Sequence, residues 1–122
     1  MYHSNFVAAK TEEILSQNLQ SLFLNQLSHE PEEINCDFFT DRLVITIKNV
    51  LTKPEQLLIC HGYTETAKKI RNSIEEILKP QLKIIIEEFV DVQTTQILFA
   101  TYLDSNYMSL IVFFDKDLDT TI

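Results

Sequence analysis

The sequence contains one glycine and three prolines among its 122 residues. Glycine and proline mark turns and irregular segments, so their scarcity predicts that helices and strands fill most of the chain. One glycine also excludes the glycine-rich loops with which nucleotide-binding proteins hold phosphate groups. The length and the 45% of apolar residues fit a single globular domain spanning residues 1–122.

Basic residues are also scarce. Ten Lys and Arg stand against 18 Asp and Glu, which gives a net charge of −8. Such a field repels nucleic acid and disfavours binding to anionic lipid. The chain has no apolar run near the ~20 residues that span a bilayer and no signal peptide. We therefore expect a cytoplasmic protein that neither binds nucleic acid nor inserts into a membrane.

Patterns of metal ligands are missing as well. Cys36 and Cys60 fall in a predicted strand and a predicted helix, where reduced, buried thiols are expected rather than a disulfide or a metal site. The histidines, His3, His29 and His61, are far apart along the chain. Residues 115–119, "DKDLD", imitate the start of a calcium loop but lack its glycine and its final glutamate. We expect no metal and no cofactor, and a polar tail at residues 115–122.

Catalytic signatures do not occur either. The sequence has no G-x-S-x-G, His-Glu-x-x-His or Cys-x-x-Cys pattern. Adjacent acidic residues, such as Glu75 and Glu76, belong to predicted solvated surfaces, which would not raise the pKa of a carboxyl group for acid–base catalysis. The sequence therefore predicts no catalytic residues, and we expect that the protein is not an enzyme.

Hydrophobic periodicity predicts the first three elements. Leucines at helical spacing indicate a helix over residues 7–28, which Pro31 and its polar neighbours end. Residues 34–38 and 43–48 alternate between apolar and polar side chains, and a turn at residues 40–42 separates them. This pattern predicts a β-hairpin.

A helix start follows the hairpin directly. Thr52 and Glu55 have the spacing of a capping box, in which each residue bonds to the backbone N–H of the other. Pro54 falls in the first turn, where a missing N–H costs little. Gly62 falls where this short helix, residues 53–61, needs a left-handed residue to end it.

A long helix is predicted over residues 64–88. Its expected apolar face consists of Ala67, Ile70, Ile74, Ile77, Leu78 and Ile85. Pro80 removes one backbone hydrogen bond, so we expect a kink or a break there. Two strands, residues 90–103 and 107–114, complete the order α-β-β-α-α-β-β. The fold class is α+β, with a mostly antiparallel four-stranded sheet and helices packed on it.

The last strand is apolar on both faces. Tyr107, Ile111 and Phe113 point one way, and the residues between them, also mostly apolar, point the other way. A sheet covered by helices on one side should have a polar second side. We therefore expect a homodimer in which a second copy covers that side. The alternative is a monomer whose first and long helices lie on opposite faces of the sheet.

Arg71 lies between the polar and apolar sides of the long helix. There it could bind an anionic ligand or pair with a carboxylate. The alternative to a binding role is a structural ion pair such as Arg71 with Glu75.

Four segments carry a family resemblance. They are "FFTDRLVITI", "LTKPEQLL", "AKKIRNSIEE" and "VDVQTTQILFATYLDSNYMSLIVFF". Over about residues 31–115 the chain resembles the MpsC-like family, once a domain of unknown function, which is named for a Na+-translocating, membrane-potential-generating system. Positions typical of the family are matched by Asp41 in the acidic turn, by Leu51, Thr52 and Glu55 around the helix start, by Arg71, and by Asp104 after the third strand.

The resemblance implies a soluble accessory protein that works near a Na+ or inorganic-carbon transporter in the membrane, and it implies no catalytic residues. The leading hypothesis is a dimeric accessory or regulatory protein that binds a protein partner. The second is a small-molecule sensor with an anion near Arg71, and Asp41 and Asp104 are further candidate binding residues. The third is an enzyme of unknown reaction.

Overall fold

The computed structural model describes residues 5–118. Its elements, in chain order, are α1 (Asn5–Leu27), β1 (Glu33–Phe38), β2 (Arg42–Lys48), α2 (Lys53–Cys60), α3 (Thr64–Val90), β3 (Thr94–Tyr102) and β4 (Tyr107–Phe114). This order confirms the predicted succession and the α+β class. The third predicted strand begins four residues too early, because α3 continues to Val90 and ends at Asp91, whose φ of 56° is left-handed.

The sheet is antiparallel throughout, with the strand order β1-β2-β4-β3. Ile45 of β2 pairs with Cys36 on one side and with Leu110 on the other, and Leu110 pairs in turn with Phe99. Because side chains alternate along a strand, these four residues form one row on one face of the sheet. β4, the second strand of the β3–β4 hairpin, therefore lies next to β2, and β3 forms the edge of the sheet.

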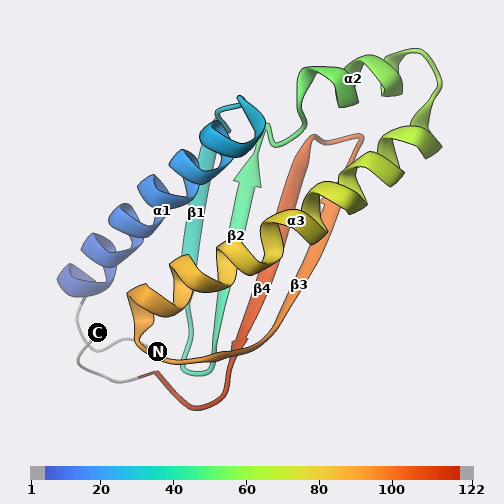
Figure 1. Cartoon of the computed structure of the whole chain (residues 1–122). Coiled ribbons are helices and arrows are strands. Elements are labelled where there is room, and N and C mark those ends of the chain that lie inside the picture. The colour runs from blue at the N-terminus through green and yellow to red at the C-terminus, as the bar shows by residue number, and fades with distance from the viewer. Residues whose placement is uncertain (1–4, 119–122) are drawn as a thin grey trace.

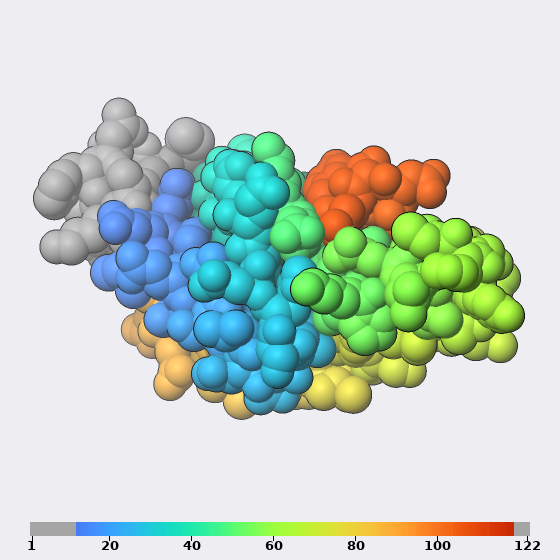
Figure 2. All heavy atoms as spheres, turned by 90° about the horizontal axis from the view of Figure 1, so that it is seen from above, coloured from blue at the N-terminus to red at the C-terminus, as the bar shows by residue number. Residues whose placement is uncertain are grey.

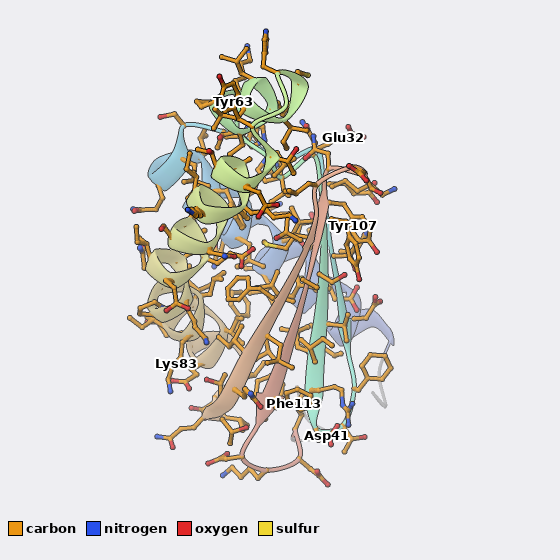
Figure 3. All side chains as sticks on the ribbon, turned by 90° about the vertical axis from the view of Figure 1, so that its right-hand side faces the viewer. Glu32, Asp41, Tyr63, Lys83, Tyr107 and Phe113 are labelled. Atoms are coloured by element: carbon orange, nitrogen blue, oxygen red, sulfur yellow. The ribbon has the colours of Figure 1, made fainter. Side chains whose placement is uncertain are left out.

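Both long helices cover the same face of the sheet (Figure 1). Leu15, Leu19 and Phe23 of α1 belong to one buried core with Leu78 and Leu82 of α3 and the inward side chains of the strands. Figure 3, which views the sheet nearly edge-on, shows α3 on one side. The monomeric alternative, with the two helices on opposite faces, is therefore wrong.

The loop from β2 to α2 is tied to the turn between β3 and β4. The Asn106 side chain accepts a hydrogen bond from the backbone N–H of Leu51 at 2.8 Å and donates one to the Asn49 side chain at 3.0 Å. Both asparagines have a left-handed φ, 57° and 53°, which asparagine tolerates better than most residues. Figure 2 shows this end of the molecule, with α2 in green beside the β3–β4 turn in orange-red.

The capping box of α2 is confirmed. The backbone N–H of Thr52 donates to the Glu55 carboxylate at 2.9 Å, and the Thr52 hydroxyl accepts from the backbone N–H of Glu55. Gly62 follows the helix with a φ of 84°. No atom lies within 4 Å of the place that a Cβ on Gly62 would take. The left-handed backbone, and not close packing, is therefore what requires glycine there.

The predicted apolar face of α3 needs a correction. Ala67 and Leu78 are buried as expected, but Ile70 and Ile77 remain 37% and 61% exposed. The helix instead buries Arg71 together with residues further along the chain: Leu82, Ile86 and Val90. The apolar arc of α3 is wider than the arc that the sheet can cover, so one edge of it stays in solvent.

Pro80 does not break α3, which runs from Thr64 to Val90 as one helix. Leu78 and Leu82, on either side of Pro80, are both buried in the core. The burial of these two leucines anchors both halves of the helix to the core although Pro80 has no N–H to donate.

Candidate functional site

Arg71 and Glu55 form a buried ion pair between α3 and α2. Arg71 is 2% exposed and Glu55 is fully buried. The Arg71 Nε donates to Glu55 Oε2 at 2.7 Å, and Nη2 donates to Oε1 at 2.5 Å. Nη2 also donates to the carbonyl oxygen of Val50 at 3.1 Å. Arg71 is therefore in a structural ion pair, the alternative to a binding role, but its partner is Glu55 and not the Glu75 suggested by the sequence.

Glu55 links the helix cap to this ion pair. Its Oε1 atom accepts from the backbone N–H and the hydroxyl of Thr52, both at 2.9 Å, as well as from Arg71. A buried carboxylate needs several donors because burial removes its water. The same carboxylate thus starts α2 and holds α3 against it. Sequence spacing identified the cap but gave no signal of the contact with Arg71, which is 16 residues further along.

A small pocket lies beside Arg71, between α3 and β3. It has a volume of about 260 Å³ and is lined by Lys68, Arg71, Asn72, Glu75, Phe99, Thr101 and Leu103. The Thr101 hydroxyl donates to Glu75 at 2.5 Å. Arg71 Nη1 is buried and has no hydrogen-bond partner among the described residues. Because Glu55 neutralises Arg71, and Lys68 and Glu75 carry opposite charges, this pocket is polar without a clear net charge.

The other two candidate binding residues, Asp41 and Asp104, lie at opposite ends of the sheet from each other. Asp41 sits in the β1–β2 turn and pairs with Arg42 at 3.0 Å, and that hydrogen bond lowers the pKa of the Asp41 carboxyl. Asp104 is exposed in the β3–β4 turn. The strand register places these two turns at opposite ends of the sheet. Figure 3 shows Asp41 at the end of the sheet away from Tyr107. The three candidates therefore do not form one site.

The sheet side away from α1 and α3, called the open face below, carries many apolar side chains. Its apolar members are Val44, Leu98, Ala100, Tyr102, Tyr107, Ile111 and Phe113. Leu98 is 42% exposed and Tyr102 is 50% exposed. Leu98 pairs with Ile111, and Ile111 pairs with Val44, so an apolar row crosses three strands. The prediction that the last strand is apolar on both sides is confirmed.

Aromatic contacts organise the two ends of the open face. The rings of Tyr102 and Tyr107 stack with centroids 5.0 Å apart. At the opposite end, the Arg42 guanidinium lies 5.1 Å from the centre of the Phe113 ring. Charged residues, among them Glu33 and Lys48, which approach within 3.5 Å, lie along β1 and the ends of β2. The open face thus has an apolar row and an aromatic pair on either side of Ser109 and Thr46, and charged residues along β1.

The thiols and imidazoles of the described residues do not gather into one metal site. Both cysteines are free, but only Cys36 is buried, so the expectation of a buried thiol is wrong for Cys60. Burial raises the pKa of Cys36 to about 11. His29 Nε2 lies 2.7 Å from the Asn49 carbonyl oxygen, and His61 Nδ1 lies 3.0 Å from that of Leu57. His3 lies outside the described residues.

Residues 5–118 contain neither a metal-ligand cluster nor a membrane-spanning helix. No three His, Cys, Asp or Glu side chains of this part of the chain gather as a metal site requires. Within the same range, no helix combines the length and apolar character needed to cross a bilayer. Of the predicted polar tail, Leu118 is buried and donates its N–H to the Thr40 carbonyl at 2.7 Å. Residues 119–122 lie outside the described part.

The comparison with protein families gives one match. A family described as "Na+-translocating membrane potential-generating system (MpsC)" matches residues 8–116. The chain belongs to the MpsC family. This membership confirms the resemblance seen in the sequence, and the match also covers most of α1. Comparisons with curated proteins and with solved structures return no match. The link to a Na+-translocating system therefore comes from the name of the MpsC family.

Proposed function

We propose that the protein is a dimeric accessory or regulatory component of a Na+-translocating membrane system, and a binding protein rather than an enzyme. The observation that carries the proposal is the open face, where Leu98 and Tyr102 of β3 are exposed and the apolar side chains of β2 and β4 are half-buried. Apolar side chains that remain at the surface in a row across several strands are typical of a protein interface. The family name supplies the transport system.

A second copy is the proposed cover of the open face. A two-fold axis through the sheet would place the apolar row of Val44, Ile111 and Leu98 against its own copy. Two sheets stacked in this way lie about 10 Å apart with interdigitating side chains. The charged residues along β1 would stay in contact with water, which avoids burying Glu33 or Asp37.

Sedimentation velocity tests the dimer. The wild-type chain should sediment as a dimer at micromolar concentration, and Leu98→Glu should sediment as a monomer, because its buried charge would lack a partner in the interface. Leu57→Glu is the matched control, since Leu57 is 60% exposed on α2, away from the sheet. A monomeric wild-type protein over a broad concentration range would overturn the dimer.

The membrane partner is tested by a separate experiment. We propose that the protein works on the cytoplasmic side, bound to a subunit of a Na+ or inorganic-carbon transporter. The tagged protein, purified from mild-detergent extracts of its own cells, should carry subunits of such a transporter in stoichiometric amounts. Recovery of the protein without any transporter subunit would contradict this part of the proposal.

A small-molecule sensor is the second candidate function. The specific observation in its favour is Arg71 Nη1, a buried donor without a partner among the described residues, beside the pocket of about 260 Å³. A small carboxylate that binds there should raise the melting temperature by mass action. Asn72→Ala, which leaves the pair of Arg71 with Glu55 intact, should abolish that rise. A screen of metabolite carboxylates without any shift would remove this candidate.

A further inference from the structure

The exposed edge of α3 carries large apolar side chains at intervals of seven residues. They are Ile70, Ile77 and Ile84, preceded by Tyr63 at the N-cap of the helix, and the four residues are called the α3 stripe below. Tyr63 and Ile84 are 60% and 59% exposed, and Ile77 is 61% exposed. From Ile70 to Ile84 the stripe extends over two heptads, about 21 Å of helix. None of its four members belongs to the buried core.

The side chains next to the stripe are small or alternate in charge. Thr66, Ser73 and Pro80, also seven residues apart, are exposed beside it. The position before each isoleucine carries Lys69, Glu76 and Lys83 in turn, all of them exposed. Lys83 approaches Glu87 of its own helix at 3.5 Å, an exposed contact of little energy. The rim of the stripe therefore presents the charge order plus, minus, plus.

An interval of seven residues selects an α-helix as the occupant. A strand would meet apolar side chains at every second residue, whereas helices that pack at a shallow angle meet at intervals of seven. The small residues beside the stripe let a helix approach closely. A groove of about 510 Å³ between α1 and α3 adjoins the end of the stripe, because Glu88, one turn beyond Ile84, lines it together with Asn18 and Asn25 of α1.

Charge decides between a second copy and a different helix. In an antiparallel α3–α3 pair in which Glu76 faces its own equivalent, Lys69 would face Lys83 of the other copy. Like charges at such positions are unfavourable. A helix with the order minus, plus, minus beside an apolar seam complements the rim instead. We propose that the α3 stripe binds an amphipathic helix of a partner protein with this charge order.

This inference deepens the proposed function, because it rests on the protein binding a partner and names the surface and the chemistry of that partner. The open face then serves the second copy, and the α3 stripe on the opposite side of the molecule serves the partner. The two surfaces do not overlap, so a dimer would present two stripes.

Designed peptides test the α3 stripe on the full-length protein. One helical peptide of four heptads has a leucine seam and Glu, Lys and Glu placed opposite Lys69, Glu76 and Lys83. A second peptide has these three charges reversed. Fluorescence anisotropy should show that the first binds with a micromolar Kd and the second several-fold more weakly at low salt. The difference between them should shrink at high salt, because screening shortens the range of exposed charges.

Single substitutions test whether the peptide binds at the α3 stripe. Ile77→Glu should raise the Kd of the first peptide at least tenfold. Leu57→Glu, which changes an equally exposed leucine outside the stripe, should leave that Kd unchanged. Leu98→Glu should abolish the proposed dimer and leave peptide binding unchanged, so failure of the dimer and failure of this inference are distinguishable. Circular dichroism should show the same helix content in all variants.

Three results would overturn the inference. The first is equal peptide binding by Ile77→Glu and the wild type. The second is a smaller sedimenting species for Ile77→Glu without any peptide, which would assign the stripe to a second copy. The third is binding to anionic phospholipid vesicles that Ile77→Glu abolishes, which would assign the stripe to a lipid surface.

Discussion

The buried ion pair of Arg71 with Glu55 connects α3 to α2. The pair lies in the interior, and Glu55 receives donors from Thr52 as well as from Arg71. A buried pair of this kind contributes little net stability compared with apolar residues, but loss of one partner leaves the other charge buried alone. The pair therefore acts mainly as a constraint on how α2 and α3 meet.

We expect Arg71→Met to lower the free energy of unfolding by about 3–5 kcal/mol, because Glu55 keeps its charge without its main partner. Arg71→Met combined with Glu55→Gln should cost less than the sum of the two single changes, since glutamine still caps α2 and carries no charge. Urea denaturation of the four proteins measures this coupling. Strict additivity of the two changes would contradict the assignment.

The two thiols should differ in reactivity. Cys60 is exposed on α2, whereas burial raises the pKa of Cys36 to about 11. Because the thiolate is the reactive form, Cys36 stays protonated and shielded at pH 8. A thiol reagent such as DTNB should modify one cysteine quickly and the second only in denaturant. In Cys60→Ser the fast reaction should disappear, and rapid labelling of Cys36 would contradict its burial.

At the scale of elements, the hydrophobic patterns located each helix and strand because those patterns are local. The pattern of α3 was less informative about which side is buried. Its apolar arc is wide enough that the core uses Leu78, Leu82 and Ile86 and leaves Ile70 and Ile77 in solvent. An exposed repeat at seven-residue spacing, visible in the printed sequence, was the available signal for the stripe.

Pro80 gives a direct test of how α3 is stabilised. Pro80 is exposed, so Pro80→Ala leaves no cavity, and it restores the N–H that can donate to the Glu76 carbonyl. We expect the free energy of unfolding to rise by about 1–3 kcal/mol, reduced by the greater freedom of the unfolded chain. Lys79→Ala, also exposed, should change it by less than about 0.5 kcal/mol. A less stable Pro80→Ala protein would contradict this account of the helix.

At the scale of the whole molecule, one face of the sheet is covered by two helices and the other by nothing in the chain described. α1 and α3 share a single core, so no helix remains for the open face. The apolar row across β2, β4 and β3 therefore stays at the surface. The proposed dimer and the proposed helix-binding stripe therefore lie on opposite sides of one thin α+β layer.

A dimer should make thermal stability depend on concentration. If folding and dimerisation are linked, the wild-type Tm should rise as protein concentration increases, because mass action favours the associated state. Leu98→Glu should show a lower Tm that does not change with concentration. Differential scanning calorimetry over a hundredfold range of concentration measures both. A wild-type Tm independent of concentration would contradict a dimer linked to folding.

The sequence by itself determined the elements, the capping box at Thr52 and Glu55, the left-handed position of Gly62 and the two apolar faces of β4. These features depend on neighbours within a few residues, so spacing and residue type are enough to predict them. Only the tertiary structure decided the strand order, the common side of α1 and α3, the partner of Arg71 and the exposed side of α3. Each of these depends on contacts between residues far apart in the chain, where several arrangements satisfy the same local pattern and packing selects one.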